Sequence, residues 1–290
     1  MTKHHDIDGF SGRSTTGHEW DGIKELNTPL PRWWLFTFYA TIIWAIGYWV
    51  VYPAWPLVHG YTTGLLHYSS RASVAVDLAN LEAVRGKEMA VLGRASLTDI
   101  EKDPALLSLA RAQGKTVFAD NCAACHGAGA AGAKGYPNLN DDDWLWGGTL
   151  DQIMQTIQYG ARSGNPSDHE GQMLAFGRDG MLKSDEIVTV ANYVRSLSGL
   201  STDPGYDATA GKKIFSDNCV VCHGEGGKGN QQVGAPNLTD QIWLYGSDKD
   251  TIVETITNGR AGVMPSWSGR LDPITIKALA VYVHSLGGGK

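Results

Sequence analysis

The pentapeptide Cys-Ala-Ala-Cys-His at residues 122–126 decides how the rest of this 290-residue chain is interpreted. A second copy, Cys-Val-Val-Cys-His, occupies residues 219–223. Two cysteines separated by two residues and followed by histidine form the attachment pattern of c-type haem. Each thiol forms a thioether bond to the porphyrin, and the histidine ligates the iron. The predicted haem-binding residues are Cys122, Cys125 and His126 in the first motif, and Cys219, Cys222 and His223 in the second.

A zinc site and a redox dithiol are the two alternatives for these cysteines. Structural zinc requires four ligands that converge on one ion, and the four cysteines of this chain could supply them. However, each pair has its own adjacent histidine and lies in its own copy of a longer repeat, and a dithiol has no need of the histidine. The spacing therefore favours two covalently bound haem c groups, each with one iron.

Composition limits the remaining possibilities. The net charge of −6 is mild and argues against a nucleic-acid-binding protein. The two motifs use all four cysteines, so no disulfide framework remains. Much of the glycine lies close to the motifs, where glycine allows the backbone to pass near a flat cofactor.

The two motifs belong to a repeat that predicts two similar domains, at residues 106–200 and 205–290. Gly114 and Phe118 precede the first motif at the same interval as Gly211 and Phe215 precede the second. A glycine and an aromatic residue four positions apart suit a helix that crosses another helix closely. Each half is predicted to be helical, and its pattern does not indicate strands.

Helix-capping signals support this interpretation. Gly160 and Gly259 close two corresponding helical patterns, as C-cap residues do. Thr149 and Gln152 have the spacing of a capping box at the start of the first of these helices. Asp272 followed by proline is a favourable start for the last helix of the chain.

An uncharged stretch of twenty residues, from Trp33 to Tyr52, predicts a membrane anchor at residues 33–56. As a helix it would be about 30 Å long, the thickness of a bilayer core, and aromatic residues crowd both of its ends, as they do at membrane interfaces. The alternatives are a buried helix of a soluble protein, which rarely runs so far without a polar residue, and a cleaved signal peptide. The leader of thirty-two residues and the Tyr-Pro-Ala-Trp-Pro sequence after the stretch argue against cleavage.

The segments on either side of the anchor complete the predicted organisation. Residues 1–32 are expected to be a mostly irregular cytoplasmic segment, because the positive charges before the anchor favour a cytoplasmic N-terminus. Everything after residue 56 would then lie in the periplasm of a bacterium. Residues 57–105 are expected to be a connector with an amphipathic helix, which packs either on the chain's own haem domains or on a partner subunit.

Methionine residues are the predicted sixth ligands of the two irons, because Met/His ligation is typical of electron-carrying cytochromes c. The candidate in the second half is Met264, the only methionine there. In the first half the spacing to the last helix favours Met173 over Met181. His169 is the alternative, and it would give bis-histidine ligation.

Pro137 and Pro236 follow the two motif histidines by eleven and thirteen residues. Their carbonyl oxygens could accept the second N–H group of each imidazole, which would fix the ring and raise its basicity. The alternative is a plain turn proline.

A resemblance to a known family covers nearly the whole chain. Besides the haem motifs, the segment HEWDGIKELN at residues 18–27 and the Pro-x-Pro-Arg-Trp-Trp sequence that ends at Trp34 are similar to the family's pre-anchor motif. The chain resembles the dihaem cytochrome c subunit (subunit III, the P subunit) of cbb3-type cytochrome c oxidases. Leu174 departs from the pattern, since many cytochromes c have proline after the ligand methionine.

The resemblance implies a mainly α-helical fold, with one N-terminal transmembrane helix followed by two tandem class I cytochrome c domains. It implies an electron-transfer subunit in the bacterial inner membrane that takes electrons from a soluble cytochrome c. The electrons would pass to a monohaem cytochrome c subunit and then to a catalytic haem-copper subunit, which reduces oxygen and pumps protons. The family also indicates that the distal methionines can be exchanged between the two domains, and the sequence leaves this pairing open.

Two other functions remain as alternatives at this point. A membrane-anchored dihaem cytochrome could serve a periplasmic dehydrogenase, and a haem sensor or peroxidase would need one five-coordinate iron. The chain itself has no recognisable enzyme active site, and no catalytic residue is predicted.

Overall fold

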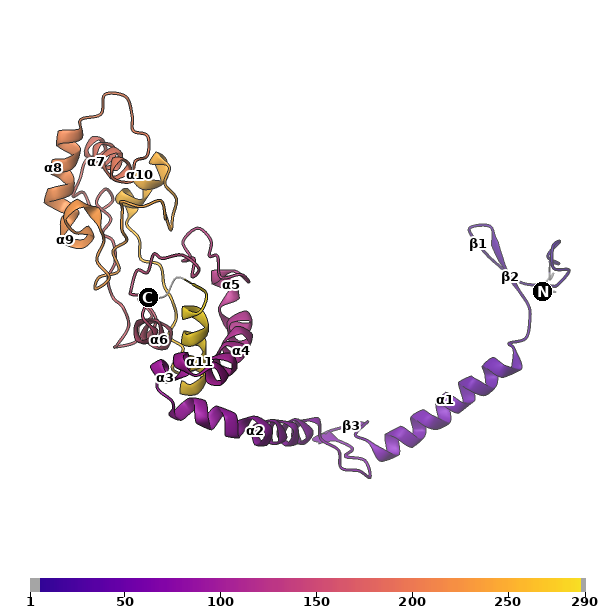
Figure 1. Ribbon diagram of the computed structural model, residues 1–290. Helices are drawn as coiled ribbons and strands as arrows, with labels where there is room; N and C mark the ends of the chain where they lie inside the picture. The colour runs from indigo at the N-terminus through magenta and orange to yellow at the C-terminus, as the bar shows by residue number, and fades with distance from the viewer. Residues whose placement is uncertain (1–5, 288–290) are drawn as a thin grey trace. The chain divides into compact units, whose positions relative to one another are not determined.

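The computed structural model describes residues 6–287, which divide into two compact units, residues 1–84 and 85–290 (Figure 1). Its described elements are mainly helical, as expected. In chain order they are β1 (Thr15–Trp20), β2 (Ile23–Leu26), α1 (Arg32–Val51), β3 (Pro56–Leu57), β4 (Gly60–Tyr61), α2 (Ser70–Arg94), α3 (Leu97–Lys102), α4 (Pro104–Asn121), α5 (Ala123–His126), α6 (Leu150–Tyr159), α7 (Ser184–Leu197), α8 (Ala208–Asn218), α9 (Val220–His223), the 3₁₀ helix η1 (Glu225–Gly227), α10 (Lys249–Asn258) and α11 (Pro273–His284).

The expectation of an irregular N-terminal segment is wrong for residues 15–26. Strands β1 and β2 pair antiparallel there. They are joined through Asp21 and Gly22, which have φ values of 50° and 84°. Two consecutive positive φ values are what a tight hairpin turn requires, and Asp-Gly is a strong signal for such a turn. Residues 1–5 of the segment lie outside the described residues.

The apolar helix α1 runs from Arg32 to Val51, and none of its residues is buried. It is the one helix in the described part of the chain that is long and apolar enough to cross a membrane. The N–H groups of Leu65 and Leu66 donate to the carbonyls of Val50 and Val51, at 3.0 Å each. The returning segment thus satisfies carbonyls that the end of a helix leaves without intrahelical partners. The last five residues of the predicted anchor, 52–56, lie beyond the end of this helix.

The connector forms the long helix α2, which spans the boundary between the two units. Its apolar residues Val74, Leu78, Leu81 and Val84, which belong to the first unit, are all exposed. Leu92, near the end of the helix, is fully buried and joins a core cluster with α3, α4 and α11.

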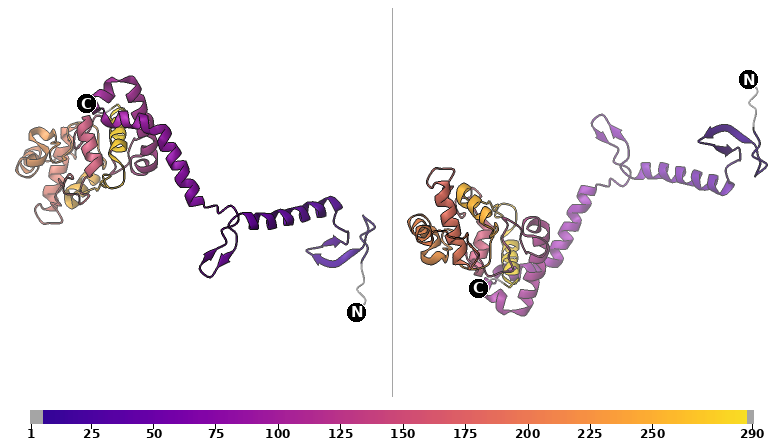
Figure 2. Two further views of the ribbon diagram at one scale, coloured as in Figure 1. Left: turned by 90° about the horizontal axis from the view of Figure 1, so that it is seen from below. Right: turned by 90° about the horizontal axis from the view of Figure 1, so that it is seen from above.

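The second unit has two further hydrophobic cores, and each combines helices from both halves of the repeat. Helix α11, from the end of the chain, packs against α4 and α6, as Figures 1 and 2 show by its yellow ribbon among magenta ones. Helix α7, from the first half, packs against α8 and α10 of the second half. The core around Phe118 is called the first core below, and the core around Phe215 the second core.

Glycines at the two main helix crossings allow this close packing, which confirms the role expected of the glycine–aromatic pairs. A Cβ atom on Gly114 would lie 2.5 Å from the carbonyl oxygen of Ala278 on α11. A Cβ atom on Gly211 would lie 2.8 Å from the Cβ of Tyr193 on α7. The expected caps are also present: Gly160 and Gly259 end α6 and α10, and Thr149 caps α6.

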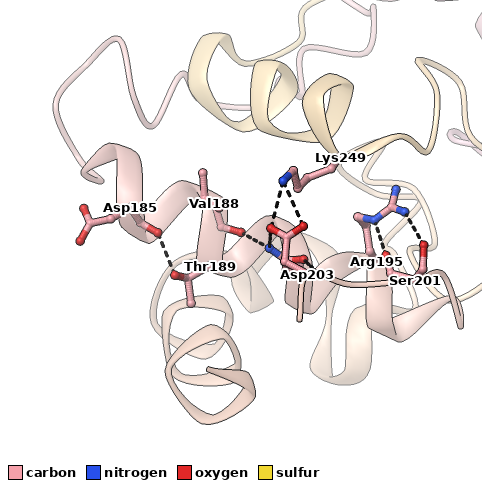
Figure 3. A network of polar contacts seen from close by, with 8 residues as sticks. Asp185, Val188, Thr189, Arg195, Ser201, Asp203 and Lys249 are labelled. Atoms are coloured by element: carbon pink, nitrogen blue, oxygen red, sulfur yellow. Dashed lines mark hydrogen bonds and ion pairs between the residues drawn. The ribbon is translucent and has the colours of Figure 1, made fainter. Parts of the chain in front are cut away.

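A network of hydrogen bonds holds the segment that connects α7 to α8. The buried side chain of Asn192 donates to Asp203 at 3.1 Å and accepts from its backbone N–H at 2.8 Å. Lys249 on α10 reaches the same carboxylate at 3.0 Å, and Arg195 lies beside Ser201 (Figure 3). The segment that joins the two sequence halves is therefore held against the second core.

Replacing Gly114 by alanine tests the crossing between α4 and α11. The added methyl group has no space against a backbone carbonyl, and overpacking of this kind costs about 1–3 kcal/mol. We expect a lower thermal midpoint of the purified full-length protein, followed by circular dichroism. Gly86 is the matched control, because it is also helical but has nothing within 4 Å of its added Cβ. An unchanged midpoint for Gly114→Ala would contradict the crossing.

Candidate functional site: two haem-attachment turns

Each motif forms one turn of helix directly after a longer helix. Cys122 ends α4 and begins α5, and the N–H of His126 donates to the carbonyl of Cys122 at 2.9 Å. Cys219 has the same place between α8 and α9, and the N–H of His223 donates to its carbonyl at 2.9 Å. Residues three and four apart on a helical turn lie on one face. The first cysteine, the second cysteine and the histidine of each motif are therefore brought to the same side.

Both motif histidines are oriented by a proline carbonyl, as the first of the two interpretations expected. His126 Nδ1 lies 2.9 Å from the carbonyl oxygen of Pro137, and His223 Nδ1 lies 3.1 Å from that of Pro236. The carbonyl can only accept, so Nδ1 carries the proton and Nε2 is left as the basic atom. Burial lowers the pKa of His223, which favours the neutral imidazole that a metal requires.

None of the four cysteine side chains is paired in a disulfide, so all four are available for attachment to a porphyrin. Burial raises the pKa of Cys122 and that of Cys219 to about 11. The two motifs pack against different cores, Cys122 on the first and Cys219 on the second. They do not converge on one tetrahedral site, and no group of three or more His, Cys, Asp or Glu side chains among residues 6–287 is placed to hold a metal ion.

The loop that carries Met264 lies on the first core, although it belongs to the second half of the sequence. The side chain of Met264 packs against the same cluster as Cys122. Its backbone exchanges two hydrogen bonds of 2.9 Å with Ala161, directly after α6. The N–H of Trp267 also donates to the carbonyl of Ile157, at 3.3 Å. The Met264 loop thereby satisfies backbone carbonyls at the C-terminal end of α6.

The loop that carries Met173 has the reciprocal position. Its side chain packs against the second core together with Cys219. Its backbone exchanges hydrogen bonds of 2.9 and 3.2 Å with Arg260, directly after α10. Phe176 donates to the carbonyl of Ile256 at the end of that helix, at 3.0 Å. The structure thus places each methionine on the core that the haem motif of the other sequence half also contacts.

The C-cap glycines of α6 and α10 have a second role that the sequence did not reveal. A Cβ atom on Gly160 would lie 2.3 Å from the carbonyl oxygen of Met264. A Cβ atom on Gly259 would lie 2.4 Å from that of Met173. Each glycine therefore ends its helix and also makes room for the backbone of the methionine loop.

The two alternative ligands are placed differently from Met173 and Met264. The side chain of Met181 is exposed. His169 Nε2 is 3.0 Å from Thr156 Oγ1, and its ring stacks on Trp146 with the centroids 4.3 Å apart. Burial lowers the pKa of His169. One of its two possible ligand atoms is thus engaged by a hydroxyl group of α6.

An orphaned donor shows that the second site is built for a further group. Trp243 Nε1 is buried and has no hydrogen-bond partner among the described residues. An unpaired buried N–H is costly, so an acceptor is expected there. A carboxylate-bearing cofactor such as haem offers such an acceptor. This donor, the attachment turn and the oriented imidazole all fit haem c.

A cavity of about 170 Å³ lies between the loops of the two halves and is lined by Trp243, Tyr136 and the carboxyl groups of Asp141 and Asp143. Burial, together with the charges of Asp240 and Asp141, raises the pKa of Asp143 to about 6. The three acidic residues at 141–143 resemble a solvated run, so the raised pKa of Asp143 could not be predicted from the sequence.

Fold and sites together define a cytochrome c class of protein, with two haem-attachment units and an apolar helix that fits a membrane anchor. Family profiles agree. Residues 12–59 match the N-terminal domain of cytochrome oxidase-cbb3, FixP, residues 111–198 match cytochrome c, and residues 207–283 match cytochrome c oxidase, cbb3-type, subunit III.

Several whole-chain relatives carry the same description. The cbb3-type cytochrome c oxidase subunit FixP of Bradyrhizobium diazoefficiens is 76% identical over 290 residues, which cover all of both chains. FixP of Azorhizobium caulinodans is 64% identical over 99% of this chain and 97% of its own length. The subunit CcoP of Azospirillum brasilense is 53% identical, with 98% of both chains covered. The chain belongs to the FixP/CcoP family of cbb3-type cytochrome c oxidase subunits.

The raised pKa of Asp143 predicts how stability depends on pH. The folded chain keeps this proton up to about pH 6, whereas the unfolded chain loses it near pH 4. The contribution of protonated Asp143 to the free energy of unfolding is therefore fully present below about pH 4, and it is lost as the pH rises through about 6. We expect Asp143→Asn to weaken the fall in thermal midpoint over this range. The exposed neighbour Asp142→Asn is the control, and an identical pH profile for Asp143→Asn would disprove the assignment.

Proposed function

We propose that this electron-transfer subunit of a cbb3-type oxidase carries two covalent haem c groups and accepts electrons from a soluble cytochrome c. It would pass them to a membrane-anchored monohaem subunit and then to the catalytic haem-copper subunit, where oxygen is reduced and protons are pumped. The observation that carries the proposal is the reciprocal placement of the two methionine loops on the two attachment turns. Relatives that are oxidase subunits over their whole length favour the oxidase over a dehydrogenase partner.

The proposed ligands follow from the two cores. His126 and Met264 would serve the haem attached to Cys122 and Cys125, because Met264 and Cys122 pack in the first core. His223 and Met173 would serve the haem of the second motif, for which Met173 and Cys219 share the second core. Residues 106–200 and 205–290 are then two cytochrome c domains in sequence that exchange their distal ligands in space.

Haem c supplies a one-electron iron couple when it is bound. The chain's own residues have three tasks around it. Pro137 and Pro236 hold the imidazoles through Nδ1, the methionine side chains would supply the sulfur ligands, and the packed cores exclude water. If a histidine and a methionine both ligate each iron, neither iron would have a position free for oxygen, and we therefore propose that oxygen is reduced in another subunit.

The proposed location is the bacterial inner membrane. Helix α1 would cross it once, with residues 1–32 in the cytoplasm and the haem domains in the periplasm. The exposed apolar residues of α2, from Val74 to Val84, would contact a partner subunit near the membrane.

Alanine variants of the methionines test the ligand pairing. The first test uses a chain that keeps only the second haem (Cys122→Ala with Cys125→Ala). There we expect Met173→Ala to remove the sixth ligand of the iron and Met264→Ala to have no effect, because each methionine serves the haem of the other sequence half. The reverse is expected in a chain that keeps only the first haem. Carbon monoxide binding to the reduced protein measures the fraction of haem whose iron lacks a sixth protein ligand. Pairing within each sequence half would give the opposite pattern.

Purification from intact membranes tests the function itself. Two haem c groups per chain are expected in the pyridine haemochrome assay, and a haem-copper oxidase is expected to co-purify. Oxygen consumption with reduced cytochrome c should fall at least about tenfold in Met173→Ala and in Met264→Ala, because an open iron has a lowered potential and a poorer fit to its redox partners. Co-purification of a dehydrogenase, without the oxidase, would refute the proposal.

A further inference from the structure

Arg162 contacts both the loop that carries Met173 and the loop that carries Met264. It follows Ala161, whose backbone pairs with Met264, and its own N–H donates to the carbonyl of His169 at 2.8 Å. Its φ of 52° is in the left-handed region, which is unfavourable for a residue with a side chain. Strained backbone of this kind persists where the surroundings require it.

The guanidinium of Arg162 contacts both loops at once. Nε donates to the carbonyl oxygen of Gly262 at 2.6 Å, and a terminal nitrogen donates to the carbonyl oxygen of Gly171. Gly262 precedes Met264 by two residues, and Gly171 precedes Met173 by two residues. One planar group with several fixed donors therefore connects the segments that carry both methionines.

The surroundings of Arg162 hold the side chain in this position. Its Cζ lies 5.8 Å from the ring centroid of Trp146, which also stacks on His169. A Cβ atom added to Gly171 or Gly234 would lie 3.1 or 2.3 Å from the Trp146 ring, so both glycines are close to it. No salt bridge to Arg162 occurs among residues 6–287. Its half-buried charge is therefore compensated by direct contacts with carbonyl oxygens and an aromatic face, and by the charge of Asp168, which acts without a direct ion pair.

A comparison with Arg260 shows that this arrangement is specific. Arg260 also lies beside a methionine loop, but its side chain bonds Thr255 and Glu254 of its own helix α10. The repeat places Ala261 at the position that corresponds to Arg162, so the second half has no equivalent side chain.

We propose that Arg162 is a positioning residue shared by the two distal loops, which holds Met173 and Met264 over their irons through the carbonyls of Gly171 and Gly262. The proposal rests on the proposed methionine ligation. Its charge lies beside both methionine loops, so with haem bound it would favour the reduced form of both irons and raise both reduction potentials. One side chain thus couples the two haem environments.

The experiment uses the full-length protein in detergent and three variants. Arg162→Gly relieves the backbone strain and removes the side chain, and Arg162→Gln removes the charge. Arg162→Lys keeps the charge but lacks the planar guanidinium group that donates to both loops. Each is combined with Met264→Ala and, separately, with Met173→Ala, so that a single methionine-ligated haem reports on each loop. The readouts are the far-red band of the sulfur–ferric iron bond, carbon monoxide binding, and the reduction potential.

A lost charged hydrogen bond weakens closure of a loop by roughly tenfold or more. We expect Arg162→Gly and Arg162→Gln to lose the sulfur–iron band and gain carbon monoxide binding in both backgrounds, with lowered potentials. Arg162→Lys should retain much of the potential and recover part of the band. Arg195→Gln is the matched control, because Arg195 also donates to the carbonyls of two loops, at Ser201 and Ser247, neither of which carries a methionine.

Four outcomes would overturn the proposal. A response in only one background, or in neither, would show that Arg162 does not serve both loops. An equal response to Arg195→Gln would mean that any lost loop contact acts in this way. If Met173→Ala and Met264→Ala themselves open no iron, the ligand assignment fails and the role of Arg162 falls with it. A loss of cooperative unfolding in Arg162→Gly, with unchanged band and potentials in Arg162→Gln, would leave only a structural role and refute positioning.

Discussion

The reciprocal backbone pairing of two loops with two helix ends is the interaction on which the haem-bearing unit depends. Met264 pairs with Ala161 after α6, and Met173 pairs with Arg260 after α10. Each pairing gives partners to carbonyls at a helix end, which would otherwise be buried without hydrogen bonds. Because each loop comes from the other half of the sequence, neither half has a complete set of backbone partners by itself.

The helix crossings reinforce this exchange. The first core contains Phe118 from α4 and Leu279 from α11, and the second contains Val190 from α7 and Phe215 from α8. Burial of these side chains is the main favourable term in folding, so the free energy of each core includes contributions from both halves. The surroundings of both haem motifs are therefore expected to form together. Rigid, shared surroundings suit an electron carrier, whose irons change charge without a large change of ligand position.

The sequence predicted the chemistry of the site well because that chemistry is local. A Cys-x-x-Cys-His turn, a proline carbonyl at the correct interval and a capped helix each depend on residues close in the chain, and the hydrogen bonds of His126 and His223 agree with the expectation. The hairpin at residues 15–26 was equally local, but its Asp21-Gly22 signal lies between weakly alternating strands and was missed. The apolar helix is recognisable from length and hydrophobicity alone.

The spatial exchange could not be predicted from hydrophobic periodicity, for a physical reason. The two halves are similar, so α7 and α11 hold corresponding places in the repeat, and either could pack on α4 or on α8. The choice is made by long-range contacts such as the backbone pairs after Gly160 and Gly259, which leave no periodic signal. Arg162 illustrates the same limit more sharply. The repeat aligns it with Ala261, so comparison of the two halves shows only that the residue types differ at this position. Its contacts with Gly171 and Gly262 form only when folding brings both loops together. The repeat thus builds two similar sites, and Arg162, which departs from the repeat, contacts the methionine loops of both.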